Sequence, residues 1–242
     1  MVSARRFMIS AAVILVGAAA SLSLITEQPV VAQQQSPQPG TPQQKPAPLK
    51  PGDVDVKRSR VYVKVDKTGL GHTHGVEGQF KSGHVELGQA GAAQKAGAMV
   101  FDMATFVADT AEARRYVGLS GTTDASTARQ VTANMTGADV LDVRRFPTAT
   151  FEIASISKAK QQPQEGTQYV LDGKFTLHGV THPMQILATA TAEKDGSTRL
   201  RGGFYVNQTS FGITPYSKAF GAVGVADRLT IYGDLILAGA TK

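Results

Sequence analysis

The chain has 242 residues and no cysteine, which excludes disulfide scaffolds, thiolate metal centres and cysteine nucleophiles. Hydrophobic residues make up 42% of the sequence, enough to bury a core, and its 25 glycines exceed the usual share of roughly 7%, which favours a turn-rich β protein over a helical bundle. The formal net charge of +6 is spread over short basic groups. These are shorter than the tracts of about five to eight residues that indicate nucleic-acid binding, so we expect no nucleic-acid partner.

Residues 1–32 have the pattern of a secretory signal peptide. Two arginines precede an apolar run over 7–25, and the small residue Ala32 follows at a position suited to cleavage. We therefore expect a periplasmic or secreted protein. An uncleaved N-terminal membrane anchor is the alternative, because the apolar run is nearly long enough to span a bilayer.

Residues 33–56 have the composition of a linker. Within 33–52 lie six of the 11 prolines and six glutamines, with almost nothing to bury. Proline-rich segments of this kind adopt extended conformations and act as semi-rigid spacers. The folded domain is therefore expected over 57–242.

Apolar and polar residues alternate in several segments of this domain. The alternation is clearest over 61–66, 151–154, 169–177 and 229–237. Successive side chains of a strand point to opposite faces, so each segment predicts a strand with one apolar face. Turn signals separate the segments, and Asp195-Gly196 is a strong hairpin signal. About eight strands at this spacing predict an antiparallel barrel or sandwich, and a barrel of that size can hold one small ligand.

Two short segments interrupt the β pattern and predict helices. The run Asp109-Thr110-Ala111-Glu112 has the spacing of a capping box ahead of a helix over 111–117. A second helix is expected over 125–135, with Asp124 as its N-cap and Gly137 as the residue that ends it. We interpret this insertion as a cap over one mouth of a barrel.

Histidines are the strongest candidates for chemistry. On an extended strand His72 and His74 would share one face, which suits paired metal ligands, and His178 or His182 could supply a third ligand. The alternative is that these histidines are polar groups that line a pocket or a turn. No nucleophile elbow, P-loop or dinucleotide fingerprint occurs, so we expect no catalysis, no resident metal ion and no cofactor.

Four segments, in order along the domain, resemble the YceI family. They are HGVEGQF (74–80), RFPTATF (145–151), LDGKFTLHGVTHP (171–183) and GFYVNQTSFGI (203–213). The third is the most specific, and in the fourth Gln208 and Ser210 stand where the family usually carries Arg and Asp. The resemblance implies an all-β fold, namely an antiparallel eight-stranded lipocalin-like β-barrel with a short helical insertion. It also implies that the protein sequesters or carries a polyisoprenoid or another long-chain amphiphile in the barrel lumen.

We expect the ligand to contact inward-facing residues of several strands, with His74 nearest the mouth. The expected lumen residues are His74, Val76, Phe101, Phe151, Ile153, Phe175, Leu177, Phe204 and Phe211. The expected partner is a long-chain isoprenoid or fatty lipid, and the protein is expected to be a monomer or a homodimer. Two alternatives stay open: an envelope interaction or structural module whose lumen is filled, and a metal-dependent enzyme that uses the histidines.

Overall fold

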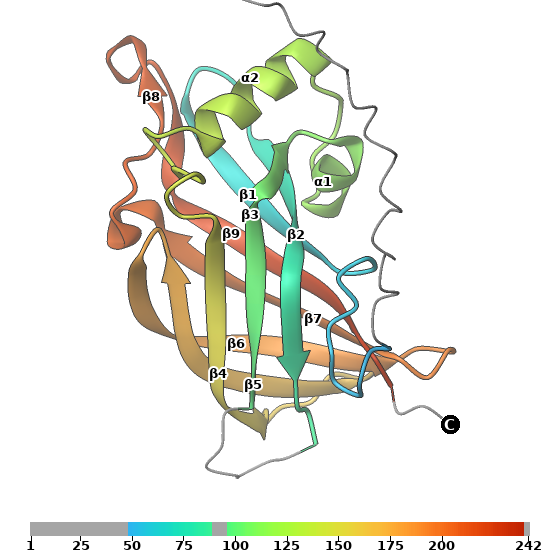
Figure 1. The fold of residues 1–242 in the computed structure, drawn as a ribbon. Coiled ribbons are helices and arrows are strands. Elements are labelled where there is room, and N and C mark those ends of the chain that lie inside the picture. The colour runs from blue at the N-terminus through green and yellow to red at the C-terminus, as the bar shows by residue number, and fades with distance from the viewer. Residues whose placement is uncertain (1–47, 89–95, 240–242) are drawn as a thin grey trace, which may run out of the picture. The chain divides into compact units, whose positions relative to one another are not determined.

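Eight long antiparallel strands close into a barrel in the computed structural model, which describes residues 48–88 and 96–239 (Figure 1). The predicted signal peptide and most of the predicted linker lie outside these residues. The strands are β1 (Arg60–Gly69), β2 (His74–Val85), β3 (Gly97–Ala108), β4 (Thr148–Lys158), β5 (Thr167–Leu177), β6 (Val180–Ala192), β7 (Thr198–Asn207) and β9 (Val223–Leu237). Each pairs with the next, and β9 pairs back to β1, which closes the ring. A two-residue strand, β8 (Ser217–Lys218), is added to β9.

The predicted alternation of apolar and polar residues corresponds to the inner and outer faces of this barrel. In β5, Leu171 and Phe175 are buried inside, whereas Lys174 points to solvent. In β3 the buried positions change parity between Met103 and Phe106, at an irregularity in the pairing of β2 with β3. Such a bulge bends the strand and turns both apolar sets inward, so that they form one core.

Residues 53–56, at the end of the predicted linker, pack against the barrel. Val54 is buried in the core and forms a bridge with Leu237. Asp53 forms a bridge with His84 and accepts a hydrogen bond from its imidazole at 2.8 Å. These four residues are therefore part of the packed domain.

The helical insertion lies between β3 and β4, and each of its two helices begins directly after a capping residue. Helix α1 (Ala111–Tyr116) is capped by Thr110, whose hydroxyl accepts a hydrogen bond from the Ala113 N–H. Helix α2 (Ala125–Thr136) is capped by Asp124 and ends at Gly137, as the sequence predicts. Asp109 does not cap α1, because its carboxylate is buried against the histidines described below. None of the helices in the described ranges is long and apolar enough to cross a membrane.

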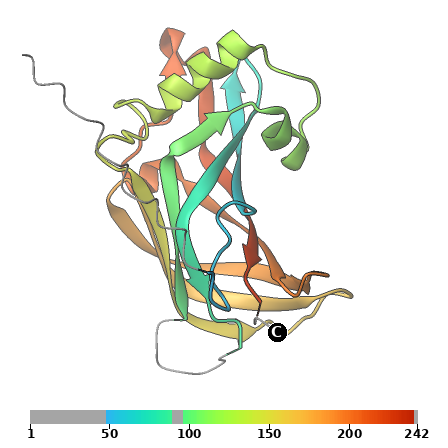
Figure 2. The ribbon, with the colours of Figure 1, turned by 45° about the vertical axis from the view of Figure 1, so that its right-hand side comes forward.

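Neighbouring strands run in opposite directions, so the connections that follow β1, β3, β5 and β7 all lie at the same end of the barrel. We call it the helical end. This helical end carries the β1–β2 turn, both α helices and the 3₁₀ helices η1 (Gln208–Phe211) and η2 (Ala219–Gly221). Figures 1 and 2 show α2 lying across it, beside the projecting loop that contains β8. The other end carries the β4–β5 and β6–β7 connections, and the latter turns at Gly196, which has the positive φ of +83° that a tight hairpin needs.

Candidate ligand-binding site

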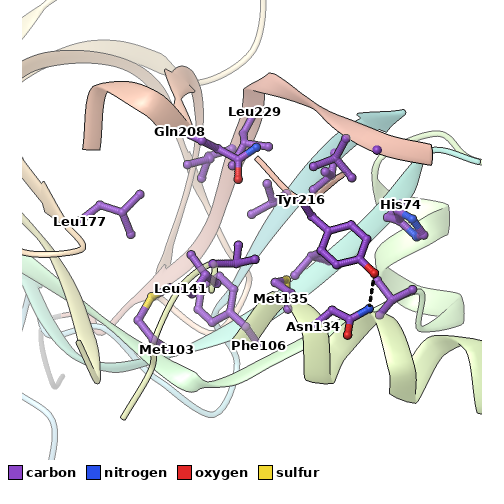
Figure 3. Close-up of a pocket in the computed structure, with 18 of the residues that line it drawn as sticks. His74, Met103, Phe106, Asn134, Met135, Leu141, Leu177, Gln208, Tyr216 and Leu229 are labelled. Carbon is purple, nitrogen blue, oxygen red and sulfur yellow. Dashed lines mark hydrogen bonds between the residues drawn. The ribbon is translucent and has the colours of Figure 1, made fainter. Parts of the chain in front are cut away.

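A cavity of about 380 Å³ lies inside the barrel and reaches the helical end (Figure 3). Its walls are mainly apolar side chains of β1, β2, β3 and β9, together with the segment that follows α2. They include Val61, Val63, Val65, Val76, Met103, Phe106, Val140, Leu141, Leu229 and Ile231. The volume lies within the range of about 300–1,000 Å³ that is usual for small-molecule sites.

Helix α2 forms the roof of this cavity. Thr127, Val131, Asn134 and Met135 line it, and their spacing of four, three and one residues places them on one face of a helix. None of the α2 residues is fully buried, and Val131 and Met135 are partly buried against the core while they line the cavity. The helical insertion therefore covers one mouth of the barrel, as expected.

Polar groups in the cavity are few and include His72, His74, Asn134, Gln208 and Tyr216. The Asn134 side chain donates a hydrogen bond of 3.1 Å to the Tyr216 hydroxyl, which joins α2 to the loop before β8 (Figure 3). Gln208 is buried, and its amide donates to the Ala226 carbonyl at 2.8 Å. The neutral Gln208 is thus satisfied by the backbone without a charged partner.

Five of the nine expected lumen residues line this cavity: His74, Val76, Phe101, Phe175 and Leu177. The other four do not. Phe204 instead borders a second, smaller cavity of about 30 Å³ deeper in the barrel. Phe151 and Ile153 are fully buried in the packed core, and Phe211 packs edge-on against Phe175 with ring centroids 5.7 Å apart. Phe151, Ile153 and Phe211 belong to the hydrophobic core and Phe204 packs against it, so these four side chains fill interior space and do not line the larger cavity.

Three side chains separate the two cavities. Val61, Phe101 and Ile231 border both of them. The Phe101 ring packs against Phe80 and Phe175, with centroids 5.0 and 6.0 Å away. Phe101 thus belongs to the floor of the larger cavity.

A charged cluster beside the mouth joins the start of β2 to the start of the helical insertion. His74 Nδ1 and His72 Nε2 lie 2.7 and 3.2 Å from the same Asp109 oxygen, Oδ2. The other oxygen, Oδ1, accepts hydrogen bonds of 3.1 Å from the Gly75 N–H and from the Arg114 guanidinium. Burial raises the pKa of Asp109, but the hydrogen bonds from His74, His72 and Gly75 outweigh it and hold that pKa well below its ordinary value.

Within the described residues, one group of side chains could hold a metal ion: His72, His74 and Asp109, whose ligand atoms lie within 4.8 Å of one another. An ion would share the Asp109 carboxylate with the Arg114 cation, which opposes its binding. Both oxygens of the Asp109 carboxylate already have hydrogen-bond partners within the cluster without an ion.

The possibility that His178 or His182 joins His72 and His74 as a third ligand does not hold, because the group that the structure brings together is His72, His74 and Asp109. His178 and Gly179 form the two-residue turn between β5 and β6, both with positive φ. The imidazole of His182 lies 2.8 Å from the Ser210 carbonyl oxygen, and that of His178 lies 3.3 Å from the Phe211 carbonyl oxygen. Both histidines therefore tie this hairpin to η1, and Asp109 takes the third position of the cluster.

Comparisons with known proteins give one family match and several similar solved structures. The family model described as YceI-like domain matches residues 53–237. The crystal structure of BcnA from Burkholderia cenocepacia superposes with a TM-score of 0.52 at 23% identity, over 76% of this chain and 99% of that one. A polyisoprenoid binding domain from Saccharophagus degradans, implicated in plant cell wall breakdown, matches at 11% identity over 78% and 99% of the two chains, with a TM-score of 0.49. No curated protein matches this chain.

Proposed function

Since the chain belongs to the family of YceI-like domains, we propose that it binds a long-chain lipid, such as a polyisoprenoid, in the cavity and performs no chemistry on it. The observation that carries this proposal is the cavity itself, an apolar space of about 380 Å³ inside a closed barrel. Its few polar groups include His72, Asn134 and Tyr216, which can face a lipid head group.

Burial of the lipid's hydrocarbon chain supplies the binding affinity in this mechanism. Each buried methylene contributes about 0.8 kcal/mol, so about ten of them give a gross 8 kcal/mol, the value of a micromolar complex. The cost of ordering a flexible chain reduces this sum. A preformed cavity limits the further cost on the protein side, because its strands and its roof are already in place.

We also propose that the protein acts outside the cytoplasm, in the periplasm or after secretion. The support is the signal-peptide pattern of residues 1–32, which precedes the folded domain. A barrel carrier in such a compartment would keep a water-insoluble lipid dispersed.

A pair of substitutions on α2 tests whether the cavity is the binding site. Val131 lines the cavity, whereas Ala133, two residues further on, is exposed on the opposite face of the helix. Val131→Trp should fill the space beneath α2 and weaken binding of a fluorescent long-chain fatty acid or isoprenoid probe by about tenfold or more, a loss of about 1.4 kcal/mol. Ala133→Trp should bind the probe as the wild-type chain does.

The two variants are compared by titration with the probe after circular dichroism has shown that both are folded. Equal affinity of all three proteins would place the ligand outside this cavity. A wild-type chain that binds no probe would instead favour the alternative of an interaction module.

A further inference from the structure

The helical end of the barrel carries an exposed apolar tip, which we define as residues 67–71 and 216–223. The Phe220 side chain is fully exposed at the turn between β8 and β9. Leu70 is 69% exposed and Val223 is 39% exposed, and the two form a bridge with each other. Exposed apolar side chains that gather at one place indicate a contact surface.

The backbone holds this tip in a defined conformation. Ala219 and Phe220 have φ values of +50° and +54°, a left-handed region that is costly for residues other than glycine. The Leu70 N–H donates to the Ala222 carbonyl at 2.9 Å, and a Cβ on Gly69 would lie 2.5 Å from that oxygen. The β1–β2 turn and η2 are therefore packed directly together, with Phe220 projecting from them.

The tip carries positive charge. Residues 67–71 and 216–223 contain Lys67 and Lys218 and no acidic residue. The acids that flank these segments have partners of their own: Asp66 pairs with Lys64 at 3.1 Å, and Asp227 accepts two hydrogen bonds from Thr209. The surface is thus complementary to an anionic partner.

The apolar surface of the tip continues into the cavity. Leu70, Gly71, Tyr216 and Val223 line the cavity as well as contributing to the tip. Figures 1 and 2 show the loop with β8 projecting at the same end as α2, the roof of the cavity. A surface that covers the tip would therefore also face the mouth.

We propose that this tip docks the mouth of the barrel onto the surface of an anionic lipid bilayer. Phe220 enters the interface between head groups and acyl chains, and the two lysines contact anionic head groups. Docking does not depend on the cavity. Its consequence, that a lipid passes between bilayer and cavity without crossing bulk water, rests on the proposed function.

The absence of cysteine allows a local test in the full chain. Ala222→Cys places an environment-sensitive fluorophore on the tip and leaves Phe220 intact, and Gln164→Cys places it on the exposed β4–β5 connection at the other end. Vesicles of equal parts phosphatidylglycerol and phosphatidylcholine should shift the emission of the tip label to the blue and expose it to quenchers carried on lipid chains. The label at residue 164 should not respond, even if the apolar run over 7–25 tethers the chain.

Two further measurements test whether Phe220 and the charge of the bilayer cause the response. Adding Phe220→Ser to the labelled chain should weaken the response by about tenfold, and pure phosphatidylcholine should give a weaker response than the mixture. Phe220→Ser should leave binding of the soluble fatty-acid probe unchanged, so that failure of docking and failure of the proposed function are distinguishable. The proposal would be overturned if the label at residue 222 showed no blue shift with vesicles, or if the label at residue 164 shifted equally. It would also be overturned if the label at residue 222 responded only to a protein partner and not to vesicles.

Discussion

Phe101 forms part of the floor of the larger cavity. Its ring lies between the space of about 380 Å³ near the mouth and the space of about 30 Å³ beneath it. Around it, Phe80, Phe175 and Phe204 form a chain of tilted and edge-on contacts. Together with Val61 and Ile231, Phe101 therefore forms the floor of the larger cavity, and in the proposed function this floor sets how far a lipid chain enters.

Phe101→Ala should join the two cavities and shift the preference toward longer chains. We expect the free energy of unfolding to fall by about 3–5 kcal/mol, since a large core side chain is removed. Competition between probes of increasing chain length measures the preference. Phe151→Ala is the matched control, because Phe151 is equally buried but borders neither cavity. An unchanged preference in Phe101→Ala would show that another group forms the floor.

At the scale of elements, the position of α1 depends on tertiary contacts, because a helix of six residues is not stable alone. Gly75 of β2 lets the helix approach: a Cβ there would lie 2.9 Å from the α1 backbone at Ala113 and Arg114. On the outer face of the barrel, Tyr116 stacks on Tyr62 with ring centroids 3.8 Å apart. The Asp109 cluster completes the attachment and joins the first residues of the insertion to β2.

Acid should weaken this attachment. Because the folded-state pKa of Asp109 lies below its ordinary value, the ionised carboxylate stabilises the fold fully above about pH 4. That contribution is lost as the pH falls further, through the folded-state pKa. His72, His74 and Arg114 are the charged or titratable groups that face the carboxylate.

Asp109→Asn should remove the part of the stability loss in acid that comes from protonation of the Asp109 carboxylate. At neutral pH it should lower the free energy of unfolding by about 3 kcal/mol, since it leaves the buried Arg114 without its carboxylate. Denaturant unfolding at a series of pH values measures both effects, with Asp139→Asn at an exposed carboxylate as the control. If Asp109→Asn lost stability in acid as steeply as the wild-type chain, the cluster would not be the cause.

At the scale of the whole molecule, local patterns predicted the architecture well. Alternation indicated the strands, and the cap residues Asp124 and Gly137 marked the ends of α2, because these signals act over a few neighbouring residues. The family resemblance correctly added closure into a barrel of eight strands. The start of the folded domain near residue 53 was harder to predict from the sequence, because Val54 is a single buried residue that follows a proline-rich run.

The candidate site was predicted only in part. The alternation of apolar and polar residues shows that a side chain points inward, but not whether the lumen is filled where it lies. The sequence therefore could not distinguish Phe151 and Ile153, which are packed in the core, from Phe175, which lines the cavity. Asp109 joins His74 across 35 residues through the pairing of β2 with β3, which no local spacing shows. The lining residues of α2 were missed, although a signal was present: Val131 and Met135 lie four residues apart within a predicted helix and so share one face.

Native mass spectrometry of the purified full chain, followed by organic extraction, tests most directly whether the barrel is a lipid carrier. We expect one extra mass of several hundred daltons for each chain, recovered in the extract as an isoprenoid or another long-chain lipid and reduced in Val131→Trp. A chain that is empty as purified, and that takes up neither added isoprenoid alcohols nor fatty acids, would contradict the carrier function.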